Sequence, residues 1–442
     1  MSHKITRRDF IRVSTLSAAV AAGVPAIAAP GSANEKLDIA IIGVGGQGNY
    51  SYENVRHENV VALVDVDSVR AGEAFAQFDP ARRFTDFRRM FDKMHQSIDA
   101  VVVATPDHTH FHPARTALEL DKHLYLEKPM AHNVWEARQL TELAAQKGLA
   151  TQLGMQRHVK DNMHRVTELV KAGAIGDVTE VHSWVSSDRG MRPRLTEPQV
   201  VPATLDYDLW LGPVEHRPYD SKITPYGWRF WWDFGTGEAG NWGCHILDIP
   251  YAALDLDYPT LVGAEGPDPH PEMTTQAMHS WFRFPAKGAR KALDLHWYQA
   301  KGGPAILQEL GLPGGGNNLF IGTQGVLLCG FDQRVLFQKD ADGNWVKKLT
   351  HEDDMGFDVP EKTVPDSPGF HREWLDACKG ASTPPTCRFE YSGPLSETVL
   401  LANAAYRAQA SFDWDHETLT CAGAPAAQAH IKPNYKEGWK VG

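Results

Sequence analysis

A glycine-rich turn near the start of the chain carries the clearest chemical signal. It follows the apolar run 38–44 and sets glycines at the first, third and sixth positions of GxGxxG, in Gly43, Val44, Gly45, Gly46, Gln47 and Gly48. Glycines there let main-chain N–H groups approach a pyrophosphate at a helix N-terminus. A second apolar run ends at Asp65, whose carboxylate would bind adenosine ribose hydroxyls and repel a 2′-phosphate. The pattern therefore predicts a dinucleotide site for NAD, with NADP disfavoured.

Aromatic side chains are concentrated between residues 226 and 242. Four of the 13 tryptophans lie there: Trp228, Trp231, Trp232 and Trp242. Flat aromatic faces complement the apolar C–H face of a pyranose, and Arg229 and Asp233 could hydrogen-bond its hydroxyls. We therefore place Trp228, Arg229, Trp231 and Trp232 in a substrate site. Tryptophans also fill cores and oligomer contacts, and we expect at least one of these to do so.

Three alternating histidines, His108, His110 and His112, follow another strand-like run. Such spacing could suggest metal ligands, but the run lies where a parallel sheet binds its ligand, and spaced histidines also cap helices or contact a cofactor. We expect His110 to contact the cofactor and no metal to be bound.

Strand-length apolar runs alternate with helix-compatible segments through residue 172. The runs 100–104, 123–126 and 150–154 read as strands, and the segments 113–120, 134–147 and 162–172 read as helices. This alternation predicts an α/β fold with a doubly wound parallel sheet. We assign residues 36–157 to this Rossmann domain.

The remainder, 158–442, has a different pattern. Runs rich in aromatic and β-branched residues, several alternating in polarity, predict strands of a half-buried sheet at 178–186, 278–285, 291–298 and 319–329. Long loops rich in proline and glycine, 189–202 and 302–318, are longer than ordinary connections and are candidates for framing a cleft.

Several short motifs, in this order, resemble those of the glucose-fructose oxidoreductase, inositol dehydrogenase and MocA (Gfo/Idh/MocA) family. They are Thr105-Pro106, Glu127-Lys128-Pro129, Gly154-Met155-Gln156-Arg157, 208–212, 228–248 and the closing segment 411–439. The resemblance implies that a C-terminal α/β domain with a large, mostly antiparallel open sheet supports the substrate site. It also implies a homo-oligomer, a dimer or tetramer, and activity on sugars or cyclitols. We expect residues 411–442 to pack back on the body.

The resemblance also assigns roles around the cofactor. It implies that Lys128 lies beside the nicotinamide and steadies a developing alkoxide, with Pro129 holding the turn through a cis peptide. It extends the cofactor-binding set to Thr105, Pro106, Glu127, Lys128 and Arg157, the last of which could instead lie at the domain seam.

His245 is the second catalytic candidate, because histidine gains or loses a proton near neutral pH. Many family members carry an aspartate four residues earlier, where this chain has Asn241, so a proton relay through that position is in doubt. Asp248 could orient the imidazole instead if the segment is helical. We place Asn241, His245 and Asp248 in the substrate site; a satisfied core histidine is the alternative for His245.

Composition and the first residues bear on partners and location. The chain has 442 residues and a formal charge of −11, with no basic block beyond the first dozen residues, which argues against a nucleic-acid partner. Arg7 and Arg8, with Phe10 and the short apolar run 13–29, resemble a twin-arginine signal. We expect residues 1–33 to direct export through the twin-arginine translocon to the periplasm or beyond, although an uncleaved anchor is an alternative.

The five cysteines contain no CxxC pair, which argues against a disulfide scaffold or a zinc or iron–sulfur site. Cys378 and Cys387 could bridge after export or remain buried thiols.

These features favour an exported oxidoreductase that oxidises a sugar, glycoside or polyol hydroxyl with tightly bound NAD, because no comparable soluble NAD pool exists outside the cytoplasm. Two alternatives stay open. Some relatives are NAD-dependent glycosidases, which oxidise a ring hydroxyl, eliminate the aglycone, add water and return the hydride. The other is a non-catalytic carbohydrate-binding protein with a relict nucleotide site.

Overall fold

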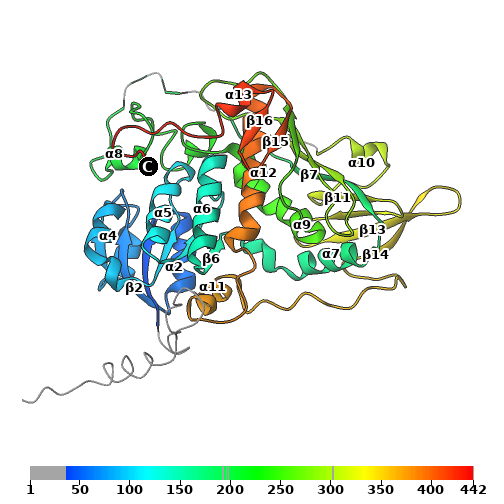
Figure 1. Ribbon diagram of the computed structural model, residues 1–442, viewed down its shortest axis with the longest axis horizontal. Coiled ribbons are helices and arrows are strands. Elements are labelled where there is room, and N and C mark those ends of the chain that lie inside the picture. Colours follow the sequence, from blue (N-terminus) through cyan, green and yellow to red (C-terminus); the bar gives the residue numbers. More distant parts are fainter. Residues whose placement is uncertain (1–35, 192–193, 196, 198, 301–302, 442) are drawn as a thin grey trace, which may run out of the picture.

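The computed structural model describes residues 36–191, 194–195, 197, 199–300 and 303–441, and the expected signal segment 1–33 lies outside them. The described chain forms two α/β units, each built on one sheet (Figure 1). Among the described residues, no helix combines the length and apolar character needed to cross a bilayer.

The first sheet has six strands, all paired in parallel. In spatial order they are β3 (Arg82–Phe84), β2 (Asn59–Val64), β1 (Asp38–Ile42), β4 (Ala100–Val103), β5 (His123–Leu126) and β6 (Thr151–Leu153). The central strands β1 and β4 are buried along almost their whole length, because helices shield both faces of a parallel sheet. The expected doubly wound Rossmann sheet is confirmed.

The helices of this unit connect successive strands. They are α2 (Gln47–Val55), α3 (Gly72–Gln77), α4 (Phe87–Met94), α5 (Phe111–Glu119) and α6 (Val134–Lys147). Helix α6 has clear local end signals: Asn133 Oδ1 accepts the Glu136 N–H at 3.1 Å, and Gly148 ends the helix with φ of 61°.

The strand order reverses direction between β1 and β4. The chain leaves β1 toward β2 on one side and leaves β4 toward β5 on the other, so the turns after these adjacent strands diverge. Such a divergence opens a crevice at the carboxyl ends of the strands, where doubly wound sheets bind ligands.

The second sheet has ten strands and is mixed, with β7 and β10 its parallel pair. In spatial order they are β14 (Trp345–Thr350), β13 (Arg334–Lys339), β12 (Val326–Cys329), β11 (Asn318–Gly322), β7 (Val178–Val185), β10 (Leu293–Gln299), β9 (Met278–Phe284), β8 (Leu261–Glu265), β15 (Phe412–Asp415) and β16 (Thr420–Ala422). The mostly antiparallel sheet expected for the second half is confirmed.

Two details of this unit differ from expectation. The run 319–329 is a hairpin of β11 and β12, because the chain reverses tightly and the Gly322 N–H bonds the Gly325 carbonyl at 2.9 Å. The loop 302–318 contains α10 (Ile306–Glu309), whose Leu307 packs with Trp184 on the sheet, so its described part does not line the large cavity at the strand ends of the first unit.

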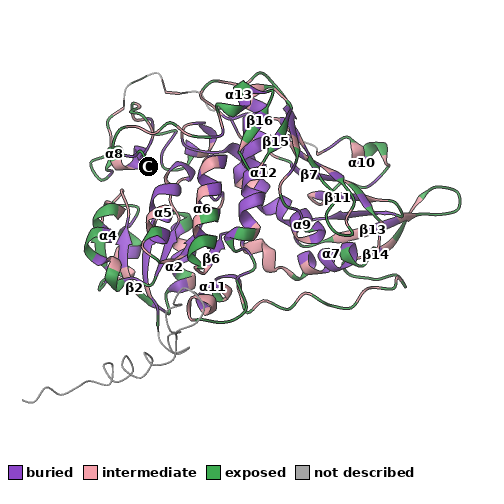
Figure 2. Cartoon of the chain, in the orientation of Figure 1, coloured by how far each residue is buried: buried purple, intermediate pink, exposed green. Residues whose placement is uncertain are grey.

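The remaining helices are α7 (Asp161–Lys171), α8 (Tyr207–Leu211), α9 (Cys244–Leu254), α11 (Phe370–Cys378), α12 (Phe389–Ala408) and α13 (Pro425–Gln428). Helix α12 lies between the two units, against α6 on one side and β8 and β9 on the other (Figure 1), and is largely buried (Figure 2). Arg138 of α6 pairs with Glu397 of α12 through bonds of 2.8 and 2.9 Å, both side chains buried. Removing one partner of such a pair costs about 3–5 kcal/mol, so the two units are held firmly together.

The segment after α13 returns to the first unit. The Trp439 carbonyl lies 2.8 Å from His112 Nε2 of α5, and the Tyr435 hydroxyl donates to Glu136 of α6 at 2.6 Å. The end of the chain accordingly lies near α8 and above α5 (Figure 1).

Candidate active site

A cavity of about 830 Å³ opens at the switch point between β1 and β4. Its walls come from the glycine turn, the turns after β4 and β5, the segment after β6, the aromatic segment, the start of α9 and the C-terminal segment. Residues predicted to bind cofactor or substrate that line it are Gly43, Gly45, Gly46, Gln47, Asp65, Thr105, Pro106, His110, Glu127, Lys128, Arg157, Trp228, Arg229, Asn241 and His245.

The glycine turn is closed against β4 and has no room for side chains. Gly43 has φ of +83°, and a Cβ there would lie 2.7 Å from the Ala104 carbonyl oxygen. A Cβ on Gly48 would lie 2.1 Å from the Gly43 carbonyl oxygen. Only glycine fits these two positions, and the bare main chain is left to face the cavity.

Asp65 lies across the glycine turn, at the end of β2. Its Oδ2 accepts the N–H groups of Val44 at 3.0 Å and Gly45 at 3.2 Å, and burial raises the pKa of its carboxyl. The Arg70 guanidinium lies beside Gly45 and Gly46. This end of the cavity therefore offers a narrow glycine cradle with one carboxylate and one cation, which suits the adenosine and pyrophosphate parts of a dinucleotide.

The turn after β4 is fastened to the turn after β5 by His110. Its two ring nitrogens each lie 2.8 Å from a main-chain carbonyl oxygen, that of Pro129 and that of Thr105, and burial lowers the pKa of the ring. The Thr105 hydroxyl beside it is buried without a hydrogen-bond partner in the described structure. An orphaned hydroxyl of this kind fits a ligand group in the cavity, because leaving it unpaired costs about 1–3 kcal/mol.

The other two histidines of the alternating run also bind main-chain carbonyls. The ring nitrogens of His108 lie 3.2 and 2.9 Å from the carbonyl oxygens of Phe234 and Trp210, and burial lowers its pKa to about 3. His112 binds the Trp439 carbonyl. The three side chains therefore point to different segments instead of converging on one point.

Lys128 connects the nucleotide unit to the second unit. Its Nζ donates to the main-chain carbonyl of Asn241 at 2.8 Å and to the Asn241 side-chain oxygen at 3.3 Å. The Lys128–Pro129 peptide bond is cis, as the sequence predicted. Burial, with the nearby Arg229 charge, lowers the pKa of Lys128. An ammonium carries three N–H donors, so one is left for a ligand.

Glu127 is held on the wall below Lys128. Its buried Oε1 accepts from Gln156 Nε2 at 2.9 Å and from Gln47 Nε2 at 3.4 Å, and burial raises its pKa. A Cβ on Gly154 would lie 2.6 Å from this carboxylate. The motif residues therefore interlock the ends of β5 and β6 with α2.

His245 lies in the first turn of α9 and faces the same cavity. Its Nδ1 is buried with no hydrogen-bond partner among the residues described. Burial, together with the charges of Lys128 and Arg157, lowers its pKa well below the usual value. The imidazole is therefore neutral near pH 7 and able to accept a proton.

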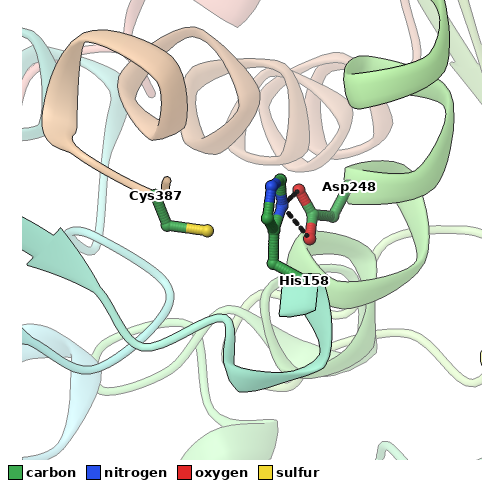
Figure 3. A group of neighbouring side chains, drawn as sticks. All are labelled: His158, Asp248 and Cys387. Carbon is green, nitrogen blue, oxygen red and sulfur yellow. Dashed lines mark hydrogen bonds and ion pairs between the residues drawn. The ribbon is translucent and has the colours of Figure 1, made fainter. Parts of the chain in front are cut away.

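Asp248 does not orient His245, contrary to the sequence-based expectation, and it does not line the cavity. It is fully buried and accepts from His158 Nδ1 at 2.9 and 3.0 Å (Figure 3). It also accepts from the Tyr391 hydroxyl at 2.6 Å. The two residues share α9, but the second turn of the helix packs against the segment after β6 and against α12. Asp248 therefore fixes the helix that carries His245 without touching that imidazole.

A thiol lies beside this pair. His158, Asp248 and Cys387 place possible metal ligand atoms within 4.8 Å of one another (Figure 3). The hydrogen bonds from His158 and Tyr391 already explain the position of the Asp248 carboxylate. Burial holds the pKa of the Cys387 thiol well above its usual value. Cys378 and Cys387 are both free thiols, so the disulfide considered from the sequence is not formed.

The tryptophans of the aromatic segment point in different directions. Trp228 lines the cavity, beneath the guanidinium of Arg229. Trp231 belongs to a separate hydrophobic cluster, and Trp232 bonds the His270 carbonyl at 3.0 Å and faces a different cavity. Trp231 and Trp232, which we expected at the substrate site, therefore do not line this cavity, because the chain turns through a tight helical loop, Gly227–Phe230, that sends successive side chains into the core. Asp233 is likewise paired with Arg217.

Sequence reasoning missed the carboxylate that holds Asn241. Glu238 is fully buried, accepts from Asn241 Nδ2 at 2.9 Å and pairs with Arg189, which donates to the Tyr226 hydroxyl at 2.9 Å. Its position three residues before Asn241, close to one helical turn, is a signal that could have found it. Trp439, which lines the cavity from the far end of the sequence, had no such signal.

Comparisons with known proteins agree with this geometry. Residues 37–155 match the family GFO_IDH_MocA, described as an oxidoreductase family with an NAD-binding Rossmann fold. Residues 159–291 match the C-terminal alpha/beta domain of the same oxidoreductase family.

Among curated proteins, inositol 2-dehydrogenase of Rubrobacter xylanophilus is 29% identical over 182 residues, which is 40% of this chain and 51% of that protein. The chain thus matches only about half the length of this relative. Among solved structures, an NAD-binding protein from Listeria innocua aligns with a TM-score of 0.60 at 16% identity, over 86% of this chain and 97% of that one. The aldose-aldose oxidoreductase from Caulobacter crescentus aligns with a TM-score of 0.56 at 15% identity, over 86% and 100%. At these identities the structural likeness shows the fold.

Proposed function

The chain belongs to the Gfo/Idh/MocA oxidoreductase family, and we propose that it oxidises a hydroxyl of a sugar, glycoside or polyol with tightly held NAD. Inositol 2-dehydrogenase, a polyol dehydrogenase by name, is the curated relative described above. The observation that carries the proposal is the convergence of Lys128 and His245 on the cavity that begins at the glycine turn.

The residues present fit a dinucleotide. The glycine cradle, the Asp65 carboxylate and the orphaned Thr105 hydroxyl line one continuous cavity that ends at Lys128. When bound, NAD supplies a hydride acceptor for the carbon that bears the substrate hydroxyl. Asp65 favours NAD over NADP, because a carboxylate repels a 2′-phosphate.

Lys128 and His245 have different roles toward the substrate oxygen. The third N–H of Lys128 points a positive charge at that oxygen and stabilises it as an alkoxide develops. His245 is neutral and takes the hydroxyl proton, so the carbon loses a hydride and the oxygen loses a proton. Asn241 orients Lys128 through two bonds and carries no charge that would neutralise it.

We also propose that the mature protein is exported through the twin-arginine translocon and assembles as a homo-oligomer. An enzyme that keeps its NAD outside the cytoplasm must close its redox cycle within the site. It does so by passing the hydride to a second substrate or by returning it to the same sugar.

The test is to purify the protein, identify any nucleotide released on denaturation, and measure sugar oxidation without added cofactor. Reduction of the bound nucleotide by a sugar or polyol supports the proposal. Release of free sugar from glycosides, without net oxidation, would assign the glycosidase reaction instead. Protein that carries no nucleotide and does not bind NAD would overturn the proposal in favour of a non-catalytic binding protein.

A further inference from the structure

Three cations line the substrate end of the cavity, and the two arginines among them have no acidic partner in the described part of the chain. Lys128, Arg157 and Arg229 all face it, together with Asn241 and His245. The guanidinium groups of Arg157 and Arg229 make no hydrogen bond and no ion pair to any described residue. Two unpaired guanidinium groups in one partly buried cavity repel each other, and they are stabilised when an anion enters.

Both arginines are held by aromatic rings. Arg229 lies 4.3 Å from the ring centre of Trp228 and 5.4 Å from that of Tyr226. Arg157 lies 4.5 Å from the ring centre of Phe331 and 5.6 Å from that of Trp242. Contacts of this kind restrain a guanidinium without using its N–H groups. Two restrained forks of N–H donors are therefore available in the cavity.

The carboxylates around this end are already engaged. Glu238 is bound by Arg189 and Asn241, Glu127 by glutamine side chains, and Asp107 by Thr236, whose hydroxyl lies 2.7 Å from it. In addition to burial, the charges of Lys128 and Arg157 lower the pKa of His245, and the charge of Arg229 lowers that of Lys128 while Glu127 and Asp107 oppose it. The guanidinium groups of Arg157 and Arg229 thus face this end of the cavity without a carboxylate bound to them.

The glycine turn has a cation of its own. The cation that lies beside the glycine turn is Arg70, whose Nη2 would be 3.1 Å from a Cβ on Gly46. Arg157 instead lies over Trp242, with its charge acting on His245, and the charge of Arg229 acts on Lys128, which bonds Asn241.

We infer that the substrate is an anionic carbohydrate whose oxyanion is bound by Arg229 and Arg157. This inference rests on the proposed oxidoreductase function. Arginine forks bind planar carboxylates bidentately, so a uronic or aldonic acid is the expected class; a phosphate or sulfate ester presents the same chemistry from another source. A neutral sugar would leave both guanidinium groups without a counter-charge in the partly buried cavity.

The experiment uses the protein with its bound nucleotide and matched sugars. Glucose, glucuronate, glucose 6-phosphate and glucose 6-sulfate, and the same series from galactose, are compared by the absorbance of the reduced nicotinamide. We expect at least one anionic member to exceed its neutral parent in kcat/KM by about tenfold or more. The member that does so identifies the source of the oxyanion.

Variants then locate the contact. Arg229→Gln and Arg157→Gln should each lower the anionic-to-neutral ratio of kcat/KM by about tenfold to a hundredfold. Arg229→Lys, which keeps the charge, should restore part of the ratio. Arg283→Gln, on the far sheet and paired with Asp294, is the matched control and should leave the ratio unchanged. Arg229→Gln and Arg157→Gln should also lose binding of a sugar acid that is not oxidised. The rise in the thermal unfolding temperature on adding that acid measures this binding.

If neutral sugars are oxidised and no anionic sugar has a higher kcat/KM than its neutral parent in either series, this inference is overturned and the proposed function stays intact. An anionic preference that survives both glutamine variants would overturn it as well. If no sugar reduces the nucleotide, the proposed function fails, and the inference fails with it.

Discussion

Lys128 donates its shorter hydrogen bond, 2.8 Å, to the main-chain carbonyl of Asn241 and not to that residue's side chain. The catalytic candidate of the nucleotide unit is therefore held by the backbone of the second unit. A main-chain carbonyl cannot be removed by substitution, so the position of Lys128 depends on how the two units pack, with Arg138 and Glu397 fixing that packing.

Replacing Lys128 by alanine should reduce turnover by about a hundredfold or more, because the charge that stabilises a developing alkoxide is lost. The nucleotide released per protein should be unchanged, since the glycine turn holds that part of the ligand. Lys171→Ala, on the exposed end of α7, serves as the control. Turnover of Lys128→Ala within a few-fold of the unmodified protein would contradict the assignment.

Restoring aspartate at position 241 should move the pH–rate profile upward. The side-chain oxygen of residue 241 lies 3.3 Å from Lys128 Nζ, so a carboxylate there favours the ammonium and raises the lowered pKa of Lys128. Asn241→Ala, which removes the oxygen without adding charge, should slow turnover and leave the profile in place. A profile unchanged in Asn241→Asp would show that Lys128 does not set it.

Substitution of Asp65 should weaken NAD retention and relax the rejection of NADP. The structure adds that Asp65 also accepts the Val44 and Gly45 N–H groups, so alanine loosens the glycine turn as well. Asp65→Asn keeps a hydrogen-bond acceptor and removes the charge. It should therefore relax the discrimination against NADP and lose less NAD than Asp65→Ala does. Equilibrium dialysis measures the affinity of each variant for NAD and for NADP. If the unmodified protein binds NADP more tightly than NAD, the role assigned to Asp65 is wrong.

The His158–Asp248 pair should make stability depend on pH. The Asp248 carboxylate raises the pKa of His158 against the opposing effect of burial. A histidine whose pKa is raised on folding contributes stability that is fully present below its unfolded pKa, about 6.5, and is lost as pH rises through the folded value.

His158→Gln should therefore remove part of the decline in the free energy of unfolding as the pH rises above about 6.5, by about 1.4 kcal/mol for each unit of the raised pKa. Urea unfolding across that range measures it, with the exposed His351→Gln as the control. Parallel curves for His158→Gln and the unmodified protein would rule the pair out as the source.

The helices and strands were predicted most accurately from the sequence where local signals agree with the packing. Helix α6 was predicted at 134–147, and those are its bounds, because Asn133 and Gly148 mark its two ends. Helix α12 was not predicted, since it is buried almost all round, shows little amphipathic periodicity and contains Pro394. Strand β14 was missed because two consecutive lysines interrupt its apolar pattern.

At the site, residue types and spacing indicated the glycine turn and His245, and the family resemblance indicated Lys128; the structure brings all three to one cavity. The directions of Asp248, Trp231 and Trp232 depend on which neighbour packs against each, and spacing along the chain carries no such information.

Trp439 has a bearing on when the nucleotide site is completed. About 390 residues separate it from Gly46, yet both line the same cavity, where Trp439 is held by His112 and Arg88. A chain still emerging from the ribosome can form its glycine turn long before this last piece of wall exists. Under the proposed function, nucleotide that arrives early would meet an open pocket and leave again, and retention would begin only after the final segment has docked. Tightly bound nucleotide would thus indicate a molecule whose C-terminal segment has already docked.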